Sequence, residues 1–94
     1  MARFITLLNY TDQGAHNIKE STTRAHHFDS LAEKSGVRVE GQYWTLGRCD
    51  GVLILSAENE TQILQLLTQL AAQGSVRTET MPAFVATEFE SIVK

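Results

Sequence analysis

The stretch from Tyr43 to Ile54, YWTLGRCDGVLI, decides the middle of the fold. Strand-forming residues lie at both ends, and the Gly-Arg-Cys-Asp-Gly segment between them favours a turn. Gly47 and Gly51 bracket Asp50, so we expect positive φ angles at the glycines and a bond from the Asp50 side chain to the turn backbone. The stretch therefore predicts a tight hairpin.

Outward from the hairpin, the spacing of apolar residues predicts four strands and three helices. Strands are expected over residues 3–9, 37–46, 51–57 and 75–81, the last one ending at Pro82. Helical spacing predicts helices over about residues 15–34 and 60–73, and a short terminal helix after Pro82. The order βαββαβ with a C-terminal helix predicts one α+β, ferredoxin-like domain over residues 1–94, with two helices on one face of an antiparallel sheet.

Cap residues mark the ends of the helices. Thr11 or Asp12 can cap the first helix, and Gly36 ends it. The segment Asn59–Gln62 has the spacing of a capping box, and Gly74 ends the helix that follows. In the terminal helix the apolar residues fall on one side, at Val85, Phe89, Ile92 and Val93.

The second face of the predicted sheet has no helix to cover it. Large apolar residues occur at both parities of the strands, as in Val52–Leu55, whereas a solvated face gives a cleaner alternation. We therefore expect a homodimer in which the two sheets pack face to face, and this dimer could associate further into a higher oligomer. The alternative is that central strands are simply apolar on both sides.

Composition and charge exclude several classes of function. The chain carries a net charge of -3 with scattered Lys and Arg, which argues against nucleic-acid binding. The longest wholly apolar run, Val52–Leu55, is too short for a membrane span. Residues 1–3 lead directly into a strand with no apolar leader, and the single Cys49 excludes an internal disulfide. These features predict a cytoplasmic protein.

Several stretches resemble one known family along nearly the whole chain. They are Phe4–Gly14, Tyr43–Arg48, Asp50–Gly51 and Val76–Thr80, and they resemble the GYD domain family of small bacterial proteins. Cys49 stands where that family usually has the Tyr of its Gly-Tyr-Asp signature. The resemblance implies a dimeric ferredoxin-like α+β barrel, and it implies no particular reaction.

The residues that could carry chemistry lack the spacing that a metal site or a nucleophile needs. His16 and His27 share a helix side but would lie roughly 16 Å apart, and His26 points about 100° away from His27. We therefore predict no metal and no cofactor, although one His could line a pocket. Cys49 sits beside Arg48 with no base nearby, so we interpret it as a turn residue.

Polar side chains on the strands are candidates for orienting a small ligand. Arg77 and Glu79 are two residues apart on the fourth strand, so their side chains point to the same face of the sheet. The same holds for Tyr43 and Thr45 on the second strand, and Tyr10 ends the first strand. We predict that these five residues line a pocket between the sheet and the two main helices. An edge-strand ion pair and cross-strand Thr pairs are the structural alternative.

Three hypotheses of function follow. The first is a bacterial homodimer that acts as a binding or accessory protein for a small apolar or aromatic molecule and catalyses no reaction. The second is a cofactor-independent oxygenase or isomerase acting on such a molecule, with His26 or His27 as the base. The third is a structural domain that serves assembly alone.

Overall fold

A four-stranded antiparallel sheet forms the centre of the computed structural model, which describes all residues from Met1 to Lys94. Its strands are β1 (Ala2–Tyr10), β2 (Arg38–Trp44), β3 (Gly51–Ala57) and β4 (Val76–Ala83). They lie in the order β2-β3-β1-β4, so the first and third strands are central and the hairpin partner β2 lies at one edge. This order confirms the predicted ferredoxin-like arrangement.

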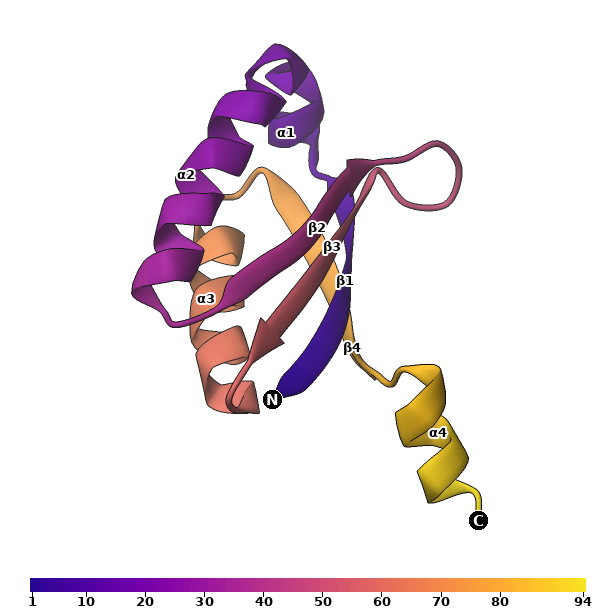
Figure 1. Cartoon of the computed structure of the whole chain (residues 1–94). Coiled ribbons are helices and arrows are strands. Elements are labelled where there is room, and N and C mark those ends of the chain that lie inside the picture. Colours follow the sequence, from indigo (N-terminus) through magenta and orange to yellow (C-terminus); the bar gives the residue numbers. More distant parts are fainter.

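Helices cover one face of the sheet only. The chain passes from β1 through α1 (Asp12–His16) and a short 3₁₀ turn (Ile18–Glu20) into α2 (Ser21–Lys34), and from β3 into α3 (Glu60–Ala72). Both α2 and α3 lie on the same side of the sheet (Figure 1). The core fills the space between these layers, and its buried side chains include Phe4, Phe28, Leu55, Ile63 and Leu66.

The predicted caps of the main helices are present. Asn59 accepts a hydrogen bond from the Gln62 N–H at 3.1 Å, and the Gln62 side chain accepts one from the Asn59 N–H, which completes the capping box. Gly36 and Gly74 follow the ends of α2 and α3 with positive φ angles of 76° and 81°. Only glycine adopts this conformation without strain, so these two positions fix where each helix stops.

The first helix does not run unbroken over residues 15–34 as predicted. It separates at Asn17, where φ is -107° and ψ is 34°. The Asn17 side chain donates to the Gln13 carbonyl oxygen at 3.1 Å, and Ser21 Oγ donates to the Ile18 carbonyl oxygen at 2.7 Å. Asn and Ser side chains compete in this way with the helical pattern, and the break leaves Ile18 exposed instead of facing the core.

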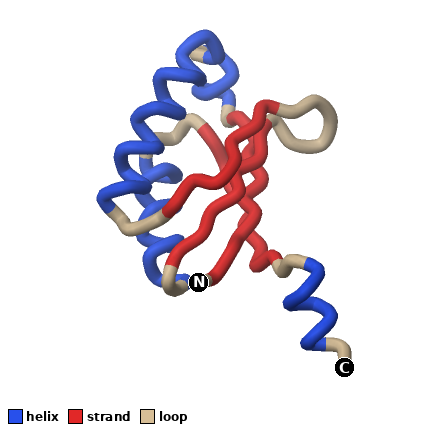
Figure 2. The backbone as a smooth tube through the Cα atoms, viewed as in Figure 1, coloured by secondary structure: helices blue, strands red, loops and turns tan.

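Two further boundaries differ from the sequence-based expectation. β4 continues through Pro82 to Ala83, because β4 is an edge strand and the missing N–H of Pro82 costs no ladder bond there. The hairpin is not tight, since residues 45–50 form an open loop in which only Gly47 has a positive φ angle. Figure 2 shows this loop projecting beyond the sheet.

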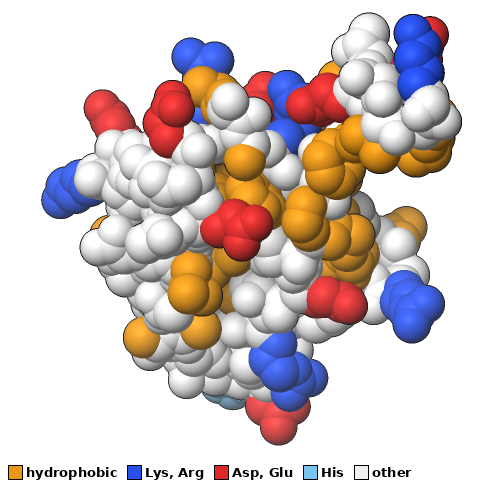
Figure 3. All heavy atoms as spheres, turned by 90° about the horizontal axis from the view of Figure 1, so that it is seen from below, with side chains coloured by type: hydrophobic (Ala, Val, Ile, Leu, Met, Phe, Trp, Pro, Cys, Tyr) orange, Lys and Arg blue, Asp and Glu red, His pale blue; other side chains and the backbone are white.

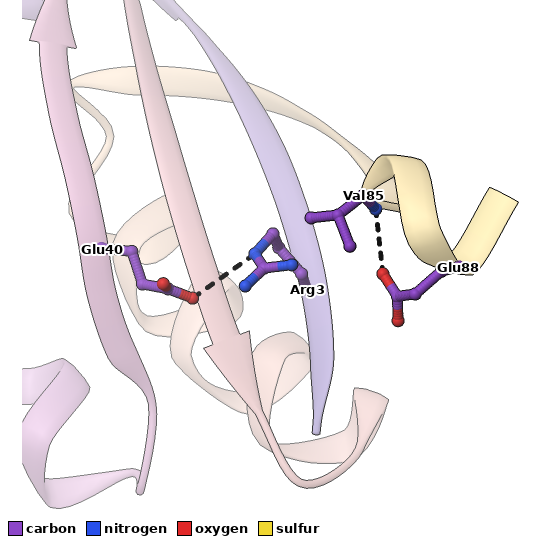
Figure 4. A network of polar contacts seen from close by, with 4 residues as sticks. All are labelled: Arg3, Glu40, Val85 and Glu88. Atoms are coloured by element: carbon purple, nitrogen blue, oxygen red, sulfur yellow. Dashed lines mark hydrogen bonds and ion pairs between the residues drawn. The ribbon is translucent and has the colours of Figure 1, made fainter. Parts of the chain in front are cut away.

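The second face of the sheet, which we call the open face, carries no helix (Figure 2). Strand pairing places Ile5, Leu7, Val52, Ile54, Tyr43 and Met81 on it, alternating with residues that face the helices. Near one end of this face Arg3 Nε lies 3.6 Å from Glu40 Oε2, an ion pair that spans β3 (Figure 4). The open face is therefore apolar along its central strands. Charged residues lie toward that end and also on the edge strand β4, at Arg77 and Glu79.

The C-terminal helix α4 (Ala86–Ile92) projects away from the sheet and the other helices (Figure 1). Its first turn is held by a hydrogen bond from the Val85 N–H to Glu88 Oε1 at 2.9 Å (Figure 4). Phe89 and Ile92 are 59% and 62% exposed, and Phe84, Val85 and Val93 are exposed beside them. Seen from below, hydrophobic side chains gather into a patch on the surface with charged groups around it (Figure 3).

Candidate functional site

A cavity of about 70 Å³ lies between α2 and the ends of the strands nearest the 45–50 loop. Its apolar walls come from both layers, and they include Leu8, Phe28, Leu53, Leu70 and Val76. α2 contributes Ser21, Arg24, Ala25 and Phe28, which recur at helical spacing and so share one side of the helix. Trp44, half exposed at the end of β2, also lines the cavity.

Polar groups gather at the rim of this cavity. The Tyr10 hydroxyl lies 3.0 Å from Ser21 Oγ, which joins the end of β1 to the start of α2. The Arg24 guanidinium donates to Ser21 Oγ at 3.2 Å and to the Asn17 carbonyl oxygen at 2.9 Å. The rim therefore carries two hydroxyl groups and one cation above an apolar floor.

Asp50 connects the 45–50 loop to the end of β1. Its N–H donates to the Leu8 carbonyl oxygen at 2.8 Å, and its carboxylate accepts the Tyr10 N–H at 2.8 Å. The side chain thus bonds to a neighbouring strand and not to its own turn, which corrects the sequence-based expectation. This contact places Tyr10 and Asp50 together at the cavity, where both are half-buried.

The segment that follows Tyr10 is hydrogen-bonded to the turn before β4 and packs closely against it. Thr11 accepts the Gly14 N–H as the N-cap of α1, as predicted, and its hydroxyl donates to the Gly74 carbonyl oxygen at 2.6 Å. A Cβ at Gly14 would lie 1.9 Å from the Ser75 carbonyl oxygen, so the two backbones pack too closely for any side chain. These contacts hold the cavity wall formed by Tyr10 and Ser75 in place.

The five predicted ligand-binding residues lie in three places: the cavity, the 45–50 loop and the open face. Tyr10 lines the cavity, and Tyr43 contributes to its lining although its ring lies on the open face, beside Gly41 and Ile54. Thr45 lies in the loop and donates its hydroxyl to the Cys49 carbonyl oxygen at 2.6 Å.

Arg77 and Glu79 pair with Asn9 and Leu7 and so lie on the open face, away from the cavity. The strand parity alone does not say which side the helices cover, which is why the sequence grouped these two residues with Tyr10. On the helix side, the Thr6 and Thr80 hydroxyls lie 2.8 Å apart and form the cross-strand pair considered as the alternative.

The histidines and the cysteine lie outside the cavity. His16, His26 and His27 are exposed, because α2 turns Phe28 and Arg24 toward the sheet and carries His26 and His27 on other sides. Cys49 is free and half-buried in the loop, with Sγ 3.6 Å from Thr45 Oγ1. No helix in the structure has the length and hydropathy needed to cross a bilayer.

Sequence reasoning missed Ser21, Arg24 and Asp50 as parts of the site. A detectable signal was present on α2, since Ser21 and Arg24 occupy the same helix side as Phe28 and Ala32. Polar residues on an otherwise core-facing side indicate either a partner for them or a cavity beside them. No sequence pattern indicates the role of Asp50, because its bonds to the β1 backbone depend on how close the 45–50 loop lies to that strand.

Comparisons with known proteins agree with this architecture. A Thermus thermophilus protein named glutamine synthetase and cystathionine beta-lyase binding protein is 36% identical over 84 residues, which cover 88% of each chain. The crystal structure of FFRP-DM1 matches with a TM-score of 0.64 at 15% identity, over 89% of this chain and 100% of that one. The crystal structure of TTHA0845 from Thermus thermophilus matches with a TM-score of 0.59 at 20% identity, over 92% of this chain and 96% of that one.

The two structural matches show the fold alone, because their sequences are distant. The family model described as GYD domain matches residues 4–93, which includes the Tyr10 to Gly14 segment and the loop with Asp50. Together with the 36% identity to the Thermus protein, this match shows the family. The chain therefore belongs to the GYD domain family.

Proposed function

We propose that the chain is a homodimeric accessory protein that binds enzymes of amino-acid metabolism and holds a small apolar or aromatic molecule in its cavity. The single observation that carries the proposal is the Thermus thermophilus relative, which is named as a binding protein for glutamine synthetase and cystathionine beta-lyase. The match extends over 88% of both chains, so the similarity concerns the whole fold and not a shared segment.

Surface area supports the homodimer. The chain exposes 6414 Å², whereas a compact monomer of 10.5 kDa exposes about 5,400 Å² on the general scaling of surface with mass. The excess of about 1,000 Å² is comparable to the roughly 800 Å² that each partner buries in a standard interface. A second copy of the chain packed on the open face would cover this excess.

The position of apolar residues that remain accessible supports the same interface. The open face presents the half-buried side chains of Ile5, Leu7 and Ile54. Helix α4 extends beyond the end of β4 (Figure 1), with Phe89 and Ile92 exposed. A helix as short as α4 has little stability of its own in water, so it needs an apolar partner. In the proposed dimer this partner is the other subunit.

The cavity supports the small-molecule part of the proposal. Apolar walls topped by a few polar groups are the usual composition of a binding pocket. The enzyme hypothesis needed His26 or His27 as a base inside this cavity, and both side chains are exposed elsewhere on α2. Their position favours binding over catalysis.

Sedimentation velocity with two purified enzymes tests the proposal. The chain is mixed in turn with glutamine synthetase and cystathionine beta-lyase from the same source, and with ovalbumin as an unrelated control. We expect the chain to sediment with at least one of the enzymes and not with ovalbumin. Free sedimentation of the chain in all three mixtures would contradict the proposal.

A further inference from the structure

The cavity beneath α2 combines a cation that forms no ion pair, Arg24, with an apolar floor. Phe28, Leu53 and Leu70 form the floor and are buried, whereas Arg24 and Ser21 at the rim are half-buried. The volume of about 70 Å³ is on the order of five water molecules, each needing about 10–15 Å³ of such space. A cavity that encloses a benzene ring has about 150 Å³, so a ring would enter this cavity only in part and extend from its open mouth.

The hydrogen bonds of Arg24 leave its charge available. Its two hydrogen-bond partners, the Asn17 carbonyl oxygen and Ser21 Oγ, are neutral. The ion pair in the structure joins Arg3 to Glu40 on the other face of the sheet. A guanidinium has five N–H donors in a planar fork, so Arg24 keeps donors for a further acceptor. The fork matches the two oxygens of a carboxylate better than a single-point cation does.

We infer that the cavity binds a small organic monocarboxylate, with the carboxylate at Arg24 and a compact apolar or aromatic body over Phe28 and Leu70. This inference rests on the proposed binding function and specifies the chemistry of its ligand. Asp50 lies on the same rim and bears a negative charge, which disfavours a ligand with a second carboxylate. The Ser21 hydroxyl donates to the Ile18 carbonyl oxygen, and the Tyr10 hydroxyl therefore donates to Ser21 Oγ. The donors left at this rim for a carboxylate are those of the Arg24 guanidinium.

Trp44 provides a direct reporter, because it is the single tryptophan of the chain and it lines the cavity. The full chain is titrated with phenylacetate, with the neutral phenylacetamide and with the cationic 2-phenylethylamine while Trp44 fluorescence is recorded. We expect a saturable change with phenylacetate, and binding of the amide weaker by about tenfold, since the amide loses a charge-assisted bond. We expect no saturable change with the amine.

Variants of arginine test whether Arg24 provides the preference for the anion. Arg24→Gln should lower the affinity for phenylacetate to the affinity for phenylacetamide. Arg24→Lys keeps the charge but loses the planar fork, so it should still bind phenylacetate somewhat more tightly than phenylacetamide. Arg38→Gln, an exposed arginine on β2, is the matched control and should leave the affinity for phenylacetate unchanged. Arg24→Lys keeps the test valid even where Arg24→Gln fails to fold.

Each other outcome overturns the inference in a recognisable way. Equal affinity for phenylacetate and phenylacetamide would overturn the carboxylate assignment, while leaving an apolar pocket in place. Tighter binding of the amine would assign the charged contact to Asp50 instead. Absence of a saturable change with all three probes would overturn the cavity as a binding site, whereas failure of the proposed enzyme binding is detected separately by sedimentation.

Discussion

Asp50 and Gly14 are the residues on which the geometry of the cavity depends most. Asp50 bonds through its N–H to Leu8 and through its carboxylate to the Tyr10 N–H, so it closes the end of β1. Because Gly14 has no side chain, the backbone of α1 can pack against the carbonyl group of Ser75. Both belong to stretches that resemble the family, and both act through backbone contacts that no side-chain pattern in the sequence records.

Replacing Asp50 by Ala should lower the free energy of unfolding by about 1–2 kcal/mol, because the partly buried Tyr10 N–H loses a charge-assisted acceptor. Asp50→Asn keeps an acceptor oxygen and should cost less than half of that. The control is Asp29→Ala on the exposed side of α2, where a change within about 0.5 kcal/mol is expected. Urea denaturation at fixed protein concentration measures all three; equal effects at Asp50 and Asp29 would contradict the bridging role.

Replacing Gly14 by Ala should destabilise the protein although Ala normally favours a helix by about 1 kcal/mol over Gly. The added Cβ would meet the Ser75 carbonyl oxygen at 1.9 Å, so the backbone of α1 must move. We expect a loss of about 1–3 kcal/mol. Gly47→Ala is the comparison, since its Cβ meets nothing within 4 Å and its cost comes from the φ of 101° alone. Thermal unfolding at or above the wild-type midpoint for Gly14→Ala would refute this packing.

At the scale of the elements, much of the fold could be predicted from local patterns. The bounds of β3, the Asn59–Gln62 capping box and the glycines that end α2 and α3 all follow from local chemistry, and the structure has them. The break at Asn17 and the open 45–50 loop were missed, because each depends on side-chain bonds that compete with the regular pattern. β4 passes through Pro82 because its position at the sheet edge is a tertiary property.

The candidate site was less predictable than the fold for a related reason. Tyr10, which closes a strand beside a helix, lines the cavity, whereas Arg77 and Glu79 lie on the opposite face of the sheet. Arg24 lies on the same side of α2 as apolar residues such as Phe28, and apolar spacing alone does not distinguish it. Which face of a sheet receives the helices is decided by packing, and parity by itself cannot supply it.

Helix α4 provides a prediction of its own. Phe89→Asp should weaken the proposed dimer by about 2–3 kcal/mol, or roughly 30–150-fold in dissociation constant, because an apolar side chain leaves the interface. The stability of the remaining fold should change little, since α4 stands away from it (Figure 1). Ser91→Asp, on the side of α4 opposite Phe89, is the matched control and should leave the dimer intact. Sedimentation equilibrium measures both; equal dissociation constants for the two variants would contradict the role of α4.

The molecule as a whole is more extended than a compact chain of its length. Its radius of gyration is 13.9 Å, against about 12.4 Å expected for a compact chain of this length. The difference arises from α4 and from a sheet that helices cover on one side only (Figure 2). In our proposal the second copy covers the open face, while the cavity on the other side of the sheet stays accessible to a ligand.

A native mass spectrum of the full chain tests this central claim most directly. We predict a species of twice the 10.5 kDa chain mass, because the chain exposes 6414 Å², whereas a compact monomer of this mass exposes about 5,400 Å². A chain that remains monomeric as its concentration is raised would contradict the account.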